Sequence, residues 1–250
     1  MTDRRDLALD LLVYTRSFAT LVGAGVSLTN VLTILEEVSD EPLASATARI
    51  HKGVLEHGEP PDVRPLSAWM RDRPDLFTWL YVQVVRVGEI GGVLDEALSR
   101  VADLMESDWA LWDPGRAHFC SLLVPPADET PFAERPPDER LRLLSLYCYS
   151  LAMMRVAGVP FTEITHGRIS ALGVAAEVFP PGPERDALAR IAEPTGGRAL
   201  SASLTLPFIP PFVTRLVAVG ERSNLLDEML DKAAVLLEYQ RRHHLLKRAE

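Results

Sequence analysis

Two acidic clusters hold the side chains of this sequence that could bind a cation. Each opens with a Gly-Glu pair and closes with an Asp-Glu pair: Gly88, Glu89, Asp95 and Glu96 in the first half, and Gly220, Glu221, Asp227 and Glu228 in the second. Carboxylate oxygens suit a hard cation such as Ca²⁺, and they also pair with basic side chains of a partner protein. Glu89 and Asp95 are therefore the candidate metal ligands.

The same residues also have a purely structural interpretation. The dipole of a helix stabilises a carboxylate near the helix N-terminus by ~0.3–1 kcal/mol. Gly88 and Gly220 could supply a positive φ angle at the end of the preceding helix. Because the sequence offers no further oxygen ligands around either cluster, we favour the structural interpretation and expect no cofactor, with calcium at Glu89 and Asp95 as the alternative.

The sequence contains none of the common catalytic motifs. It lacks the Gly-x-x-x-x-Gly-Lys-Ser/Thr loop of many ATPases and the Gly-x-Ser-x-Gly elbow of many hydrolases. Its six histidines do not follow His-Glu-x-x-His spacing, and its two cysteines cannot complete a typical zinc quartet. We therefore expect a protein that is not an enzyme.

Composition excludes further classes of protein. The net charge of −9 argues against a nucleic-acid-binding protein. Cys120 and Cys148 form no Cys-x-x-Cys pair, and the polar residues 1–6 do not resemble a secretory signal, so we expect a cytoplasmic location. No apolar run approaches the ~20 residues that a transmembrane helix needs.

The segment 239–248 is basic, in contrast to the rest of the chain, and contains Arg241 and Arg242. Cations near the C-terminus of a helix interact favourably with the helix dipole, which is one explanation. The other is a surface that contacts a partner or acidic lipid head groups, at ~1 kcal/mol per basic residue. Both explanations remain open from the sequence.

The two halves of the chain read alike. The matching segments are 18–28 with 151–161, and 87–98 with 219–230. Gly158 follows Gly25 by 133 residues. Gly220 follows Gly88 by 132 residues. Two separated segments that keep nearly the same offset indicate a duplicated domain, longer than the ~20–50 residues of solenoid repeats. The predicted domains are 1–111 and 138–250, and the proline-rich segment 112–137 is the predicted linker.

Apolar residues recur with helical spacing, and alternating strand patterns are nearly absent, which predicts an all-α fold. The predicted helices are 6–22, 27–38, 42–57, 65–71, 75–87 and 91–111 in the first copy, and 138–157, 160–178, 183–192, 200–205, 209–219 and 223–247 in the second. The last helix of each copy carries an apolar stripe: Leu94, Leu98, Val101 and Met105, matched by Leu226, Leu230, Ala233 and Leu237. We expect each stripe to pack inside its own bundle, with a copy-to-copy or homodimer interface as the alternative.

These motifs resemble the type II secretion system protein F domain, which type IV pilus assembly platform proteins share. The residues that carry the resemblance are Phe18–Leu28 and Leu151–Phe161, Leu66–Ala68 and Leu200–Ala202, and Gly88–Leu94 and Gly220–Leu226. They lie in the same order in both copies and spread over most of the chain. Asn224 stands where the family pattern has a glycine.

The resemblance implies that each copy is a six-helix antiparallel bundle facing the cytoplasm, in a non-enzymatic platform at the inner membrane. It implies a secretion or pilus assembly ATPase and platform or pilin-like proteins as partners. It also implies calcium binding by acidic residues, since some family domains are reported to bind it. The family's membrane spans are absent from 112–137, so we expect a soluble module, with peripheral membrane contact through the basic C-terminus. A scaffold no longer tied to secretion, or an enzyme with an unrecognised helical site, are the alternatives.

Overall fold

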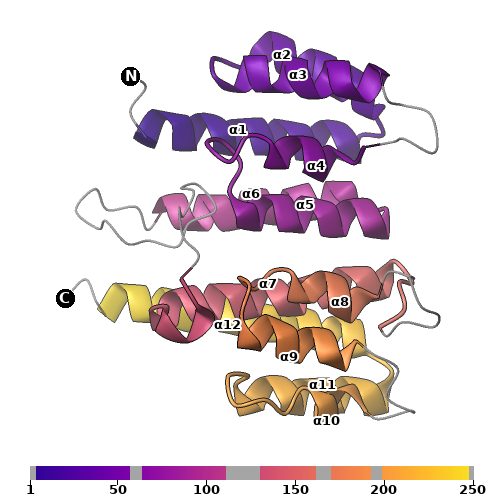
Figure 1. Ribbon diagram of the computed structural model, residues 1–250, viewed down its shortest axis with the longest axis vertical. Coiled ribbons are helices and arrows are strands. Elements are labelled where there is room, and N and C mark those ends of the chain that lie inside the picture. The colour runs from indigo at the N-terminus through magenta and orange to yellow at the C-terminus, as the bar shows by residue number, and fades with distance from the viewer. Residues whose placement is uncertain (1–3, 57–63, 111–129, 162–169, 193–198, 248–250) are drawn as a thin grey trace. The chain divides into compact units, whose positions relative to one another are not determined.

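The chain folds into two helical units in the computed structural model, which describes residues 4–56, 64–110, 130–161, 170–192 and 199–247. Unit 1 spans Met1–Ala127 and unit 2 spans Asp128–Glu250. Every regular element in the described ranges is a helix, so the all-α prediction is confirmed. The described residues of each unit form six α-helices, which are labelled in Figure 1.

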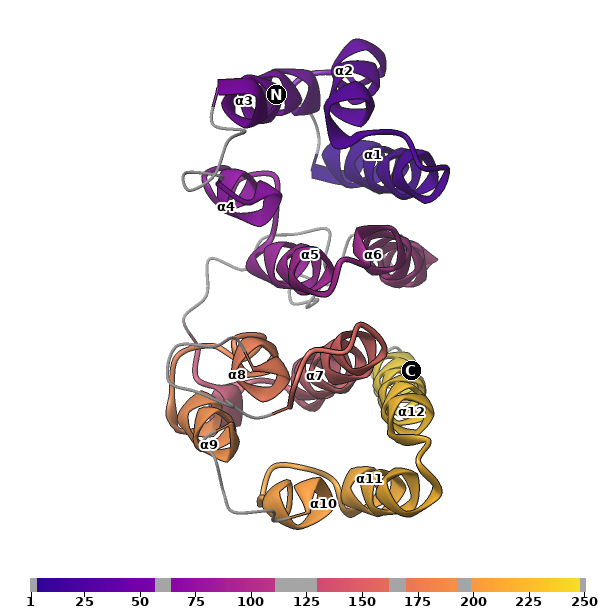
Figure 2. The same cartoon turned by 90° about the vertical axis from the view of Figure 1, so that its right-hand side faces the viewer.

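Unit 1 is built from α1 (Arg4–Gly23), α2 (Leu28–Val38), α3 (Leu43–Glu56), α4 (Leu66–Arg71), α5 (Trp79–Gly91) and α6 (Leu94–Ala110). The hydroxyl oxygens of Ser27 and Thr78 accept hydrogen bonds from backbone N–H groups at the starts of α2 and α5. Helix α1 packs along α6, and α2 packs against α3 (Figure 2).

The mainly aliphatic core of unit 1 contains a cluster of aromatic rings. The ring of Tyr14 contacts the rings of Phe18 and Phe77, and Phe77 contacts Tyr81. The hydroxyl of Thr47 donates a hydrogen bond to the Tyr14 hydroxyl over 3.1 Å, which satisfies a polar atom that burial would otherwise strand. Burial raises the pKa of Tyr14 to about 12, so this phenol stays protonated at neutral pH.

Unit 2 contains a 3₁₀ turn, η1 (Phe132–Glu134), followed by α7 (Pro137–Val156), α8 (Ala171–Ala176), α9 (Pro183–Ile191), α10 (Leu200–Ser203), α11 (Pro211–Ser223) and α12 (Leu226–Lys247). The longest packing interface of the unit joins α7 to α12 (Figure 2). The ring of Phe132 contacts the rings of Phe179 and Phe208, which also contact each other, so this end of the predicted linker is part of unit 2. The rest of that linker up to residue 129 lies outside the described residues.

The prediction that a helix starts at Pro160 is wrong. Residues 159–161 are not helical, and the described helix of this region is α8. The carbonyls of Pro160 and Phe161 accept hydrogen bonds from the N–H groups of Ala171 and Leu172. The backbone at Pro160 is therefore paired with the start of α8 instead of continuing a helix of its own; residues 162–169 lie outside the described part of the chain.

Gly25 and Gly158 end the first helix of each unit in the same way. Both have a left-handed backbone, with φ of 78° and 74°. The N–H of the next residue bonds to a carbonyl five positions earlier, from Val26 to Leu21 and from Val159 to Met154. This is the Schellman ending, which strongly prefers glycine at the left-handed position. The two glycines picked out by the repeat thus stop equivalent helices.

The stripes on α6 and α12 lie inside their bundles as the sequence predicts, except that their first residues, Leu94 and Leu226, are only half-buried. Leu98, Val101 and Met105 have no exposed surface, and the same holds for Leu230, Ala233 and Leu237. The stripes are therefore bundle seams. None of the described helices combines the length and the apolar character that crossing a membrane requires.

Candidate functional site

The glycines of the two Gly-Glu pairs lie inside helices α5 and α11, not at their ends. The prediction of a positive φ at Gly88 and Gly220 is wrong, because both helices continue beyond the predicted ends. The left-handed residues that end them are Gly92, with φ of 68°, and Asn224, with φ of 59°. Asparagine tolerates this backbone better than most residues, which explains its place in the second copy.

Gly88 and Gly220 have a different structural role: they allow two helices to pack closely together. A Cβ atom placed on Gly88 would lie 2.5 Å from Cβ of Ala97 and 3.1 Å from Cα of Leu94. A Cβ atom on Gly220 would lie 2.8 Å from Cα of Leu226. Each glycine therefore lets the last helix of its unit fold back tightly against the helix before it.

The Glu89 carboxylate caps the N-terminus of a different helix from the one predicted. It accepts hydrogen bonds from the N–H groups of Leu66, over 2.5 Å, and Ser67, over 3.1 Å. These are the first residues of α4, whereas the sequence suggested α6. A carboxylate here satisfies two N–H groups that have no partner within their own helix and opposes the positive end of its dipole.

Glu221 makes the same cap in unit 2. Its two carboxylate oxygens accept hydrogen bonds from the N–H groups of Leu200, over 2.5 Å, and Ser201, over 3.3 Å. The Ser201 hydroxyl adds a third bond of 2.5 Å. Leu200 and Ser201 begin α10, the counterpart of α4. The recurrent Gly-Glu pair is thus a joint that ties three helices of each unit together, and we call it the Gly-Glu joint.

Burial of the Glu89 carboxylate has a consequence for pH. Burial is the largest influence and raises the pKa of Glu89 above its ordinary value of 4.5, although the bonds from Ser67 and Leu66 act to lower it. The folded protein then binds a proton at Glu89 more tightly than the unfolded chain does. The contribution of Glu89 to the free energy of unfolding therefore falls as pH rises from 4.5 through the raised pKa.

We expect the variant Glu89→Gln to lack this pH dependence, because its amide does not titrate. As pH rises from 4.5 to 7, the unfolding free energy of the wild type should fall relative to that of the variant. Urea titrations at both pH values measure it, with Glu37→Gln, an exposed site on α2, controlling for net charge. A difference that moves the other way would contradict the buried carboxylate.

The calcium site at Glu89 and Asp95 stays a prediction. Both oxygens of Glu89 already accept N–H groups, while Asp95 is half-buried near the end of α1, where its Cβ lies 3.8 Å from the position of a Cβ on Gly23. Asp227 is the corresponding half-buried residue of α12. Among the described residues, no group of three His, Cys, Asp or Glu side chains could hold a metal ion.

Arg241 and Arg242, the arginines of the basic segment that the structure describes, have opposite surroundings. Arg241 has no exposed surface, and its Nη1 lies 3.4 Å from a carboxylate oxygen of Glu238. The prediction that Arg241 belongs to a basic surface patch is therefore wrong. The composition of the segment could not reveal that Arg241 lies on the buried face of α12. Arg242 is exposed, so the predicted lipid or partner contact would fall to Arg242, Lys247 and their exposed neighbours.

Glu238 is the centre of a buried ion cluster that the sequence analysis missed. Its other oxygen lies 3.1 Å from Nε of Arg142, which is also fully buried. The repeat offers a signal, since Glu106 stands 132 residues earlier in α6. Glu106 pairs with Arg16 over 2.7 Å, and both side chains are partly exposed. The second copy therefore buries a charge at a position where the first copy leaves it near water.

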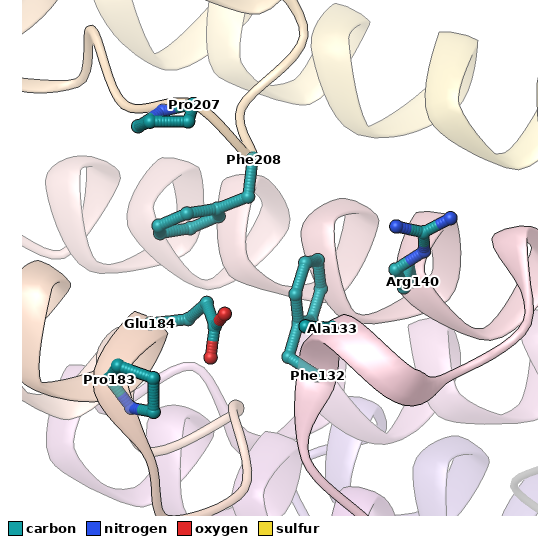
Figure 3. A pocket seen from close by; sticks show the side chains of 7 residues that line it. All are labelled: Phe132, Ala133, Arg140, Pro183, Glu184, Pro207 and Phe208. Atoms are coloured by element: carbon teal, nitrogen blue, oxygen red, sulfur yellow. The ribbon is translucent and has the colours of Figure 1, made fainter.

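Two hollows that are lined by described residues could receive a ligand or partner. The one in unit 2 has a volume of about 370 Å³. Figure 3 shows Phe132 between Glu184 on one side and Arg140 on the other, with Phe208 beside it. Because this pocket presents both signs of charge, charge alone favours no class of ligand.

The hollow in unit 1 lies between α1 and the turn from α2 to α3, and has a volume of about 170 Å³. We call it the acidic groove. The side chains that line it include Leu9, Asp10, Val13, Val38, Asp40 and Leu43. The sequence analysis did not find the groove, because its walls come from three separate elements.

Comparisons with known proteins agree with the repeated architecture. The PilC type IV pilus assembly protein of Myxococcus xanthus is 35% identical over 99 residues, 40% of this chain and 22% of that protein. Type II secretion system protein F of Xanthomonas campestris is 33% identical over 101 residues, 40% of this chain and 24% of that protein. PilC of Thermus thermophilus is 26% identical over 306 residues, 92% of this chain and 72% of that protein. The first two matches span less than a quarter of those relatives.

The family model described as type II secretion system (T2SS), protein F, matches the chain twice, over residues 14–123 and 147–250. The two matches fall on the two units that share the Schellman endings and the Gly-Glu joint. Since they cover well over half of its residues, this chain belongs to the type II secretion system protein F family.

Proposed function

We propose that this chain is a non-catalytic protein–protein interaction module of the machinery for type II secretion or type IV pilus assembly. The observation that carries the proposal is the family match to both units. The matched relatives are named for type II secretion and for type IV pilus assembly. A module of this kind binds its neighbours through surfaces of a rigid fold and changes no covalent bond.

The geometry of the carboxylates supports this function. The conspicuous acids of the sequence, Glu89 and Glu221, bond to backbone N–H groups and hold helices in place. Apolar side chains remain exposed on several helices, among them Val13, Val38 and Tyr239, at 58%, 66% and 62%. Exposed apolar surface beside charged groups suits contacts with other proteins.

The partners that we propose are a secretion or pilus assembly ATPase and platform or pilin-like proteins, with a second copy of the chain as a further partner. The proposed location is the cytoplasm, or the cytoplasmic face of the inner membrane. Contact with acidic lipids would involve exposed basic residues such as Arg242 and Lys247 on the last turns of α12.

Affinity purification of the full chain from its native cells tests the proposal. After mild crosslinking, mass spectrometry should find an assembly ATPase, a platform component or a pilin-like protein enriched over a mock purification. Enrichment of none of these three classes, with the chain itself recovered in good yield, would contradict a role in this machinery.

A further inference from the structure

We propose that the acidic groove of unit 1 binds a basic amphipathic helix of a partner protein. An aliphatic side chain of that helix would enter the groove between Val13 and Val38, and its lysine or arginine residues would lie beside Asp10 and Asp40. The inference rests on the proposed function, because it names the surface through which an interaction module would hold one of its partners.

The walls of the groove are apolar and open to water. Leu9 and Val13 are one helical turn apart on α1 and are 42% and 58% exposed, while Val38 at the end of α2 is 66% exposed. Leu43, at the start of α3, is buried and forms part of the floor. An apolar side chain seated here would remove several exposed aliphatic groups from water at once, which is the main source of binding free energy at interfaces.

The spacing of these side chains suits a helix. Residues four apart on α1 form a ridge along the helix, and the groove beside such a ridge receives a side chain from a second helix. Helices α1 and α2 border the groove, so an incoming helix could contact both. A volume of about 170 Å³ accommodates one aliphatic side chain and does not accommodate a large organic ligand.

The charges around the groove select a basic partner. Asp10 and Asp40 both line it, and within the described residues neither carboxylate has a hydrogen bond or ion pair. Burial and the neighbouring charges of Asp40 and Asp6 raise the pKa of Asp10. These acids therefore repel one another beside an apolar surface, and a lysine or arginine of a partner would relieve that repulsion.

A synthetic helix tests the inference on the intact chain. The probe is a labelled 18-residue peptide with leucine at positions i, i+3, i+4 and i+7 and lysine elsewhere; the control peptide has glutamate in place of lysine. Fluorescence anisotropy at physiological salt should show binding of the lysine peptide only.

Two charge reversals separate the groove from the overall acidity of the chain. Asp40→Lys should weaken binding of the lysine peptide by about tenfold, and Val13→Ala should weaken it without changing the charge. Asp231→Lys, at an exposed site on α12, makes the same charge change outside the groove and should have little effect. Circular dichroism confirms that each variant folds, and Asp40→Asn replaces Asp40→Lys if the latter does not.

Several outcomes would overturn the inference. Equal weakening by Asp40→Lys and Asp231→Lys would show non-specific attraction. Loss of self-association in Asp40→Lys, with no binding of the peptide by the wild type, would identify a second copy of the chain as the occupant. Failure of peptide binding together with recovery of the assembly proteins from native cells would remove the groove proposal and leave the proposed function standing.

Discussion

Replacing Glu238 with alanine is expected to destabilise unit 2 by about 3–5 kcal/mol. The variant would leave Arg142 and Arg241 fully buried without the carboxylate that faces both of them. Each buried guanidinium would keep the cost of leaving water and lose the attraction of this carboxylate, which offsets part of that cost. This is the largest effect that we expect from a single substitution in the chain.

The repeat supplies a matched control for this variant. Glu106→Ala removes a carboxylate at the equivalent position of unit 1, but its pair with Arg16 is partly exposed, so we expect a loss of about 1 kcal/mol or less. The four tryptophans of the chain all precede residue 113, so tryptophan fluorescence follows unit 1 and circular dichroism follows both units. In urea, Glu238→Ala should lower the unfolding midpoint of unit 2, which is seen by circular dichroism. The unfolding midpoint of unit 1, which is seen by tryptophan fluorescence, should stay the same. Equal losses for the two variants would contradict a buried ion cluster.

The second large effect is expected from Gly88→Ala, which should destabilise unit 1 by about 1–3 kcal/mol. The new methyl group would lie 2.5 Å from Cβ of Ala97, closer than real carbon contacts allow. Relief requires α6 to move away from α5, and this exposes part of the seam formed by Leu98 and Val101. Urea unfolding followed by tryptophan fluorescence measures the loss.

Gly23→Ala is the control for Gly88→Ala. Gly23 is the last residue of α1, where a new Cβ would meet Cβ of Asp95 at an ordinary 3.8 Å. Alanine favours the helix over glycine, so this variant should be neutral or more stable by up to ~1 kcal/mol. A tolerated Gly88→Ala would mean that the close approach of α6 does not depend on this glycine.

The elements that depend on local patterns were predictable from the sequence. Helical spacing of leucine and valine gave the all-α fold and the buried stripes that include Leu98 and Leu230, because burial of one helix face repeats along the chain. Gly25 and Gly158 could be recognised as equivalent, since a left-handed ending favours glycine wherever it occurs.

The features that depend on distant contacts were not predictable. The Glu89 cap joins residues more than 20 positions apart, so the sequence could suggest a carboxylate at a helix N-terminus but not which helix. The basic neighbours of Arg241 suggest a surface position, and nothing in them indicates that this residue lies on the buried face of α12. Pro160 looks like a first-turn residue, yet its carbonyl pairs with Ala171.

The central claim is that Glu89 and Glu221 do the same structural work in the two units, and amide hydrogen exchange of the intact chain tests it most directly. Glu89→Ala should speed exchange at the N–H groups of Leu66 and Ser67, because their acceptor is gone, and leave Leu200 and Ser201 unchanged.

Glu221→Ala should give the reverse pattern, so each variant serves as the control for the other. Exchange that stays slow at Leu66 and Ser67 in Glu89→Ala, or that slows in the wild type only when Ca²⁺ is added, would contradict the claim.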